Sequence, residues 1–187
     1  MDRIILASKS IGRRELFDKY FGEYEIHVSD INESIGITEP HKLTRELARL
    51  KAAAVAKLFT TDYVMGFDTV VVFESRIIGK PKDKEEAKKF LKMLSGKVQS
   101  VISGYCIINK TKSIFHNGSE ETVLHFKELS EDFIENYVNT HSVTKFAGGY
   151  AIQKDDSYID IIDGDYDVIV GAPMKHIIDI MKILPHK

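Results

Sequence analysis

Two long strand-like segments joined by a short turn constrain the fold of this chain most strongly. Residues 98–108 and 113–126 have the pattern of long strands, and residues 109–112 form a turn between them. This spacing is typical of an antiparallel hairpin. We therefore predict that antiparallel pairing dominates the middle of the sheet.

Strand and helix patterns alternate before this hairpin. Strands are predicted at residues 3–7, 24–28 and 63–67, and helices at residues 11–20 and 43–58 between them. Such alternation, combined with the hairpin, argues for a mixed α/β sheet rather than a purely parallel one. Because no linker-like segment interrupts the 187 residues, we expect one domain over the whole chain, residues 1–187.

The patterns after the hairpin predict two more helices and two more strands. Ser130 caps a helix that runs to about Tyr137, and an amphipathic helix covers residues 174–184. Residues 150–153 and 158–170 are predicted to be strands. The order of these elements does not by itself determine the sheet topology.

Charge, cysteine content and hydrophobicity exclude several functional classes. The formal net charge is −2, so no overall positive field favours a long nucleic acid as partner. The single cysteine, Cys106, excludes an intrachain disulfide and a cysteine-rich metal site. No apolar segment approaches the roughly 20 residues that span a bilayer, and the N-terminal apolar run is too short for a signal peptide. We therefore expect a cytoplasmic protein without a membrane partner.

Asp68 is the most informative single residue for function. It interrupts an apolar stretch from Tyr63 to Phe73, where the strand predicted at residues 63–67 is expected to end. A carboxylate there is unfavourable unless it is paired, hydrogen-bonded or bound to a metal. It is suited to act as a general base or as a ligand of a hard cation. The structural alternative is an aspartate in the turn of a tight hairpin.

The start of the helix predicted at residues 11–20 is a candidate phosphate site. It follows a strand and a serine-rich turn, so free backbone amides, Ser8, Ser10 and Arg13 are suited to hold phosphate oxygens together. The alternative is that Arg13 and Arg14 form a solvated pair on a surface helix.

A second carboxylate and two lysines extend this candidate site. Glu33 lies in a polar loop and is suited to complete a magnesium site with Asp68, since magnesium needs only one or two protein carboxylates plus phosphates. Lys51 and Lys80 are candidate charge clamps, and Lys80 stands in a stiff Gly-Lys-Pro turn. The alternatives are a solvated acidic loop and lysines that only increase solubility.

Gln153 is a candidate for contact with a nucleobase. Paired glycines at residues 148 and 149 precede the strand predicted at residues 150–153, which suggests a close backbone approach to a ligand. The carboxamide of Gln153 has both a donor and an acceptor, as the edge of a base requires. The alternative is a simple glycine turn.

Taken in order, these motifs resemble those of the Maf family over essentially the whole chain. Each motif is short, but their order and spacing are difficult to obtain by chance. The matching stretches are Leu6-Ala7-Ser8-Lys9-Ser10 with Arg13, Glu15 and Leu16, Asn32-Glu33-Ser34, Leu47-Ala48-Arg49-Leu50-Lys51-Ala52, Asp68-Thr69-Val70-Val71, Gly79-Lys80-Pro81, Leu94-Ser95-Gly96-Lys97, Glu121-Thr122, Phe126, Tyr137, the segment from Ala147 to Gln153, Gly164-Asp165-Tyr166, and Val170-Gly171-Ala172-Pro173.

The resemblance implies a fold and an activity. The fold would be a twisted mixed sheet with flanking helices, in two lobes around a nucleotide-binding cleft, related to the inosine triphosphate pyrophosphatases. The activity would be hydrolysis of the bond between the α and β phosphates of a nucleoside triphosphate, giving a monophosphate and pyrophosphate. Magnesium or manganese would be the cofactor. The family also implies a homodimer and is linked to cell-division arrest.

The resemblance further implies a role for each candidate residue. Asp68 would be the proton acceptor, and Glu33 and Asp68 would bind the metal. Lys51 and Lys80 would make catalytic contacts with the phosphates. The substrate-binding residues would be Ser8, Ser10, Arg13, Thr69 and Gln153. In the branch that acts on dTTP and UTP, the last two are tied to the choice of base.

Two departures from the family bear on the substrate. The family motif Ser-Pro-Arg-Arg is replaced by Ser10-Ile11-Gly12-Arg13, so an arginine tied to base choice is absent, and Val168 stands where asparagine is common. The leading prediction is a pyrophosphatase for dTTP, UTP or modified nucleotides. One alternative is a 7-methyl-GTP pyrophosphatase, which Thr69 and Gln153 disfavour. The other is a non-enzymatic nucleotide-binding regulator of septum formation, which the retained acidic and basic residues disfavour.

Overall fold

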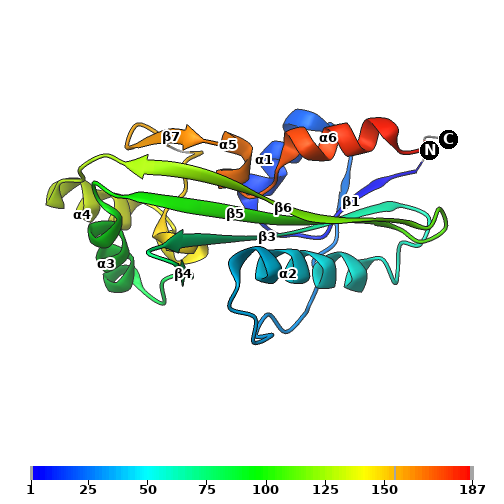
Figure 1. Ribbon diagram of the computed structural model, residues 1–187, viewed down its shortest axis with the longest axis horizontal. Coiled ribbons are helices and arrows are strands. Elements are labelled where there is room, and N and C mark those ends of the chain that lie inside the picture. Colours follow the sequence, from blue (N-terminus) through cyan, green and yellow to red (C-terminus); the bar gives the residue numbers. More distant parts are fainter. Residues whose placement is uncertain (1, 154, 186–187) are drawn as a thin grey trace.

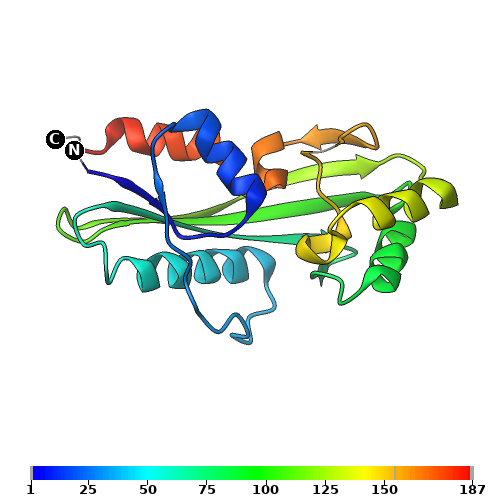
Figure 2. The same ribbon diagram turned by 180° about the vertical axis from the view of Figure 1, so that it is seen from behind.

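A computed structural model describes residues 2–153 and 155–185. Within these ranges, a seven-stranded mixed sheet extends along the molecule with helices on both of its faces (Figures 1 and 2). Its strand order is β2-β1-β3-β5-β6-β7, and β4 pairs with β3. The predicted mixed α/β sheet with flanking helices is confirmed.

The sheet has a parallel part and an antiparallel part. In the parallel part, β1 (Ile4–Leu6) lies between β2 (Glu25–Ile26) and β3 (Tyr63–Phe73). The predicted hairpin forms the centre of the antiparallel part. The antiparallel pairs are β3 with β4 (Arg76–Ile78), β3 with β5 (Val98–Asn109), β5 with β6 (Ile114–Phe126), and β6 with β7 (Ile159–Asp163).

The helices cover the sheet in two layers and also pack against one end of it (Figures 1 and 2). One face carries α1 (Ile11–Tyr20) and α6 (Met174–Ile183), and the other carries α2 (Pro40–Val55). The end distant from the termini carries α3 (Lys84–Leu94) and α4 (Glu131–Thr140), and the short α5 (Tyr166–Val170) follows β7. Among the helices of the described ranges, none is long and apolar enough to cross a membrane.

The alternation of side chains along β3 assigns each residue to one of these layers. Met65 belongs to the apolar cluster beneath α1 and α6, whereas its neighbour Val64 belongs to the cluster beneath α2. By the same alternation, Asp68 faces α2 and Thr69 faces α1. The two adjacent residues of the predicted motif therefore point to opposite faces of the sheet.

Two glycines let α2 lie very close to the sheet. A Cβ atom on Gly66 would lie 2.4 Å from the carbonyl oxygen of Ala48, and one on Gly104 would lie 2.3 Å from that of Thr44. Gly104 is the partner of Asp68 in the β3–β5 register. The absence of side chains at these positions brings the middle of α2 next to the carboxylate of Asp68.

Three predicted element boundaries were wrong. Asp68 lies inside the continuous strand β3, not at a strand end or in a hairpin turn. The helix predicted at residues 43–58 ends at Val55, and Leu58 is 80% exposed. The strand predicted at residues 158–170 ends at Asp163, because Gly164 adopts a φ of 98° and turns the chain into α5.

The segment at residues 150–153 is also not a strand. It follows a short 3-10 helix, Ala147–Gly149, in which Gly148 and Gly149 adopt positive φ angles. These conformations favour glycine and break the extended geometry that a strand requires. The N–H and carbonyl of Ala151 and the carbonyl of Ile152 instead bind tyrosine hydroxyls.

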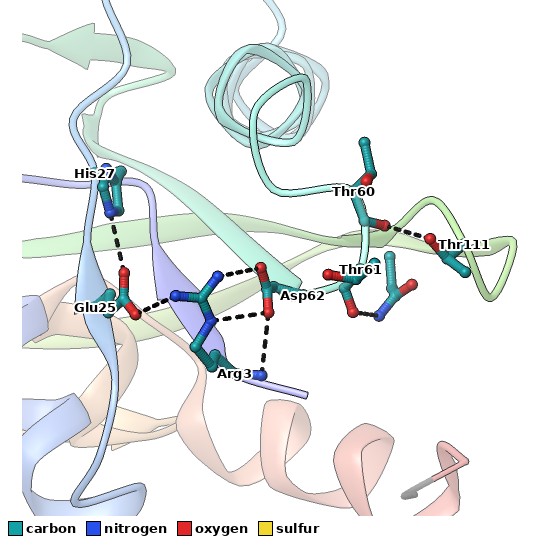
Figure 3. Close-up of polar contacts among 8 residues, drawn as sticks. Arg3, Glu25, His27, Thr60, Thr61, Asp62 and Thr111 are labelled. Carbon is teal, nitrogen blue, oxygen red and sulfur yellow. Dashed lines mark hydrogen bonds and ion pairs between the residues drawn. The ribbon is translucent and has the colours of Figure 1, made fainter. Parts of the chain in front are cut away.

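A polar network fastens the starts of the parallel strands (Figure 3). Arg3, just before β1, donates to Asp62, just before β3, from Nε at 3.2 Å and from Nη2 at 2.9 Å. It also donates from Nη1 to Glu25 of β2 at 2.6 Å, and His27 Nε2 lies 3.3 Å from the other oxygen of Glu25. Because parallel strands have no tight turn to set their register, this guanidinium helps to fix it.

We expect Asp62→Ala to lower the free energy of unfolding by about 1–3 kcal/mol, since it removes a buried acceptor of several hydrogen bonds. Asp62 is only 5% exposed. Chemical denaturation measures the effect. The control is Glu25→Ala, whose half-exposed ion pair is expected to contribute less than about 1 kcal/mol. Equal losses in the two variants would contradict the central role of Asp62.

Candidate active site

A cavity of about 390 Å³ lies where the parallel and antiparallel parts of the sheet meet. Pairing of β3 with β1 ends at Met65 and pairing with β4 begins at Val71, so this edge of β3 is open between them within the described residues. The predicted residues that line the cavity are Ser10, Arg13, Glu33, Lys51, Asp68, Thr69, Lys80 and Gln153.

Lys51 joins the two candidate carboxylates. Its Nζ lies 2.6 Å from Oδ1 of Asp68 and 2.9 Å from Oε1 of Glu33. The side chains of Lys51 and Asp68 are 12% and 10% exposed, whereas that of Glu33 is 54% exposed. A helix, a strand and a loop thus contribute one charged group each to a single cluster.

The two carboxyl groups differ in proton affinity. Burial raises the pKa of Asp68, although the charges of Lys51 and Arg13 oppose that rise. Partial burial alone would raise the pKa of Glu33, but the hydrogen bond and charge of Lys51, with the charge of Lys80, hold it below its usual value. Asp68 is therefore the better proton acceptor of the pair.

Arg13 is buried and makes three hydrogen bonds to protein acceptors. Its Nε donates to the carbonyl of Gly171 at 2.8 Å, Nη1 to Ser8 Oγ at 3.1 Å, and Nη2 to Thr69 Oγ1 at 3.0 Å. Since a guanidinium has five N–H donors, two remain. Arg13 thus anchors α1 to β3 and retains donors beside the cavity that it lines. Ser8 reaches the site through this contact rather than as a lining residue.

Ser103 supports Thr69 and was missed by the sequence reasoning. Its Oγ donates to the carbonyl of Val168 at 2.8 Å and lies 2.8 Å from Thr69 Oγ1. Thr69 Oγ1 also lies 3.4 Å from the carbonyl of Gly171, so Thr69 and Ser103 share a small network of carbonyl acceptors. Ser103 faces Thr69 across the β3–β5 register, a pairing that only the assembled sheet reveals.

Ser10, Lys80 and Gln153 line the cavity as well. Ser10 caps α1, because its Oγ accepts from the backbone N–H of Arg13 at 3.5 Å. Lys80 is exposed and directly follows Gly79. The carbonyl of Gly79 accepts a hydrogen bond from the backbone N–H of Gly148 at 3.0 Å. The segment that ends at Gln153 therefore borders the turn that carries Lys80.

Gly12 occupies a tight position beside Gln153. A Cβ atom there would lie 2.9 Å from Cγ1 of Val170 and 3.0 Å from Nε2 of Gln153. A side chain at position 12, such as the arginine of the family motif, would therefore require Val170 and Gln153 to shift. Arg14 does not replace it, since Arg14 is not among the residues that line the cavity.

The fold and the cavity define a mixed α/β protein whose cleft joins two carboxylates to several cationic side chains. The chain belongs to the Maf family: the sequence profile described as "Maf-like protein" matches residues 3–184.

Relatives with assigned names agree with this membership. Proteins named dTTP/UTP pyrophosphatase are 42% identical in Pyrococcus abyssi, over 96% of this chain and 95% of theirs; 43% identical in Pyrococcus furiosus, over 100% and 97%; and 40% identical in Bacillus cereus, over 97% and 95%. Among solved structures, the Ham1 proteins of Staphylococcus aureus and Coxiella burnetii have TM-scores of 0.49 and 0.46 at 18% and 21% identity. Each match covers 67% of this chain, with 72% of the Staphylococcus aureus chain and 73% of the Coxiella burnetii chain.

Proposed function

We propose that this protein is a nucleoside triphosphate pyrophosphatase that cleaves between the α and β phosphates. The observation that carries the proposal is the contact of Lys51 with both Asp68 and Glu33 on the wall of a cavity that Arg13 and Lys80 also line. The relatives named dTTP/UTP pyrophosphatase, matched over nearly the full length, support the same reaction. We take dTTP and UTP as the first substrates to test.

Asp68 is the proposed proton acceptor. An oxygen of water forms a bond to the α-phosphorus, the bond from that phosphorus to the bridging oxygen breaks, and pyrophosphate leaves with the electron pair. The proton of the water passes to the carboxylate of Asp68. Its raised pKa suits this role, because a general base works best when its proton affinity is near the operating pH.

The cationic side chains would neutralise the phosphates. A triphosphate carries about four negative charges, and charge moves toward the leaving pyrophosphate during the reaction. Lys51 and Lys80 line the cavity from different parts of the chain, and Arg13, which retains two N–H donors, lines it from α1. Such preorganised charge stabilises the transition state more than it would in water.

A divalent metal, magnesium or manganese, is part of the proposal. Within the described ranges, no group of three or more His, Cys, Asp or Glu side chains is arranged to hold a metal. Asp68 and Glu33 nevertheless suit magnesium, which usually binds one or two carboxylates and fills its other positions with water and phosphate oxygens. When bound with the nucleotide, the ion would supply further neutralisation of the phosphates.

The base would lie beside Thr69 and Gln153, which both line the cavity. Gln153 Nε2 and Oε1 offer a donor and an acceptor to a base edge. With glycine at position 12, the family arginine is not available there, so Gln153 is the main candidate for reading the base. The cytoplasmic location and the homodimer stay predictions from sequence and family.

The test is product analysis with dTTP, UTP, CTP, GTP, ATP and 7-methyl-GTP, each with magnesium and with manganese. We expect monophosphate and pyrophosphate, with dTTP or UTP turned over fastest. In isotopically labelled water, attack at the α-phosphorus places the label in the monophosphate. Orthophosphate as the direct product would contradict the proposed bond. Binding without turnover would support the nucleotide-binding regulator instead.

A further inference from the structure

The segment that leads to Gln153 is held by tyrosine hydroxyls instead of a neighbouring strand. Tyr137 Oη accepts from the backbone N–H of Ala151 at 2.9 Å and lies 3.2 Å from its carbonyl oxygen. Tyr158 Oη donates to the same carbonyl at 3.2 Å, and Tyr166 Oη donates to the carbonyl of Ile152 at 3.3 Å. Tyr137 is the member of this group that binds both polar groups of one peptide residue.

These hydrogen bonds are well shielded from water. Tyr137 and Tyr158 are 3% and 4% exposed, and Ala151 is 6% exposed. A buried backbone group that loses its partner is costly, so the contacts restrict the chain to one path. The rigidity of the segment thus depends on α4 and on the residue just before β7, both of which lie outside the cavity.

Gln153 depends on this path for its position. It lies two residues after Ala151 and lines the cavity. Its side chain makes no hydrogen bond to another residue in the described part of the chain, and its carboxamide packs closely against Gly12. Gln153 is therefore positioned by the path of its backbone and by its packing against Gly12.

We propose that Tyr137 is a positioning residue for base selection. Its hydroxyl fixes Ala151 and thereby holds the carboxamide of Gln153 at the wall of the cavity where a base would be read. The inference rests on the proposed pyrophosphatase function, and it assigns to α4 a part in choosing the substrate.

The test is Tyr137→Phe, which removes only the hydroxyl. Because Tyr158 still donates to the carbonyl of Ala151, the N–H of Ala151 is the group left without its partner. We expect KM for the preferred nucleotide to rise about three- to tenfold from the loss of that buried hydrogen bond, while kcat changes little. The ratio of kcat/KM between preferred and poor bases is expected to fall by a similar factor. In a Gln153→Ala background, the same substitution should leave that ratio unchanged.

The matched control is Tyr63→Phe. Tyr63 is 1% exposed and donates its hydroxyl to the carbonyl of Pro185 at 2.8 Å, near the chain termini. This variant is expected to lose stability in the same way without a change in KM or base preference. If Tyr137→Phe lowers the melting temperature but preserves base preference, or if Tyr63→Phe raises KM equally, the inference is wrong.

Calorimetric titration with a non-hydrolysable nucleotide separates this inference from the proposed function. A wild-type protein that binds nucleotides without turnover would overturn the pyrophosphatase reaction, and the base preference of Tyr137→Phe would then be read from Kd. A wild-type protein that neither binds nor hydrolyses any nucleotide would overturn both.

Discussion

Asp68→Asn is expected to lower kcat by about 10²- to 10⁴-fold, the usual contribution of a positioned general base. Asparagine keeps the shape of the side chain and an oxygen that can accept from Lys51, but it cannot take up a proton. Pyrophosphate release under saturating nucleotide measures the loss. Turnover within tenfold of the wild type would remove Asp68 from the role of proton acceptor.

The same variant should remain folded, and its stability has a predictable pH dependence. Burial raises the pKa of Asp68, so its ionised form is less favourable in the folded protein than in the unfolded chain. Below the ordinary aspartate pKa, Asp68 is protonated in both the folded and the unfolded wild type. As pH rises from there through the raised pKa of folded Asp68, the free energy of unfolding of the wild type therefore falls relative to that of Asp68→Asn. Denaturation curves at several pH values measure this difference. A variant that unfolds at neutral pH would make its loss of activity uninformative about chemistry.

A matched control for this substitution is Asp167→Asn. Asp167 is 6% exposed and accepts a hydrogen bond from Tyr20 at 2.6 Å, so it is also a buried carboxylate. It does not line the cavity. We expect Asp167→Asn to retain turnover. That result would show that neutralising a buried carboxylate is not by itself enough to lower kcat, and that the loss in Asp68→Asn is specific to Asp68.

Local signals were sufficient to predict much of the fold. The helix predicted at residues 11–20 has the bounds of α1, because Ser10 supplies its cap and the pattern of apolar residues is helical. The long hairpin was likewise predicted from its strand patterns and its turn. In both cases, the interactions that determine the element lie within the segment itself or its immediate flanks.

Predictions failed where distant residues decide the structure. Asp68 was expected to end a strand, yet β3 continues through it, because Lys51 on α2 compensates the carboxylate. Residues 150–153 were expected to be a strand, but their backbone is bound by hydroxyls from Tyr137, Tyr158 and Tyr166. No pattern within either segment reveals these partners.

The candidate site was predicted as a set of residues but not as an arrangement. A carboxylate within an apolar run was a sound reason to select Asp68, since such a group needs a partner. The sequence did not show that Lys51 would bridge Asp68 and Glu33, or that Arg13 would use three donors within the protein. The catalytic and binding roles of these residues stay predictions until the variants are measured.

Lys51→Met is expected to lower kcat/KM by about 10²- to 10³-fold, the range for removing one preorganised stabiliser of developing charge. The substitution also leaves Asp68 and Glu33 without the cation between them. Because Lys51 lowers the pKa of Asp68 and Glu33 raises it, the pKa of Asp68 should increase further. The acidic limb of the pH profile of kcat/KM is therefore expected to move to higher pH. An unchanged limb would contradict the assignment of that limb to Asp68.

Stability measurements on Lys51→Met separate its structural and catalytic roles. Removing one partner of a buried ion pair costs up to about 3–5 kcal/mol, and here the cost should shrink at acidic pH as the carboxylates take up protons. Adding Asp68→Asn should recover part of the stability but none of the activity. The matched control is Lys88→Met, because Lys88 Nζ also bridges two carboxylates, Glu85 at 3.1 Å and Glu135 at 2.6 Å, outside the cavity. If Lys88→Met lowers kcat/KM as much as Lys51→Met does, the effect reflects the general loss of an ion pair, and Lys51 has no special role in the reaction.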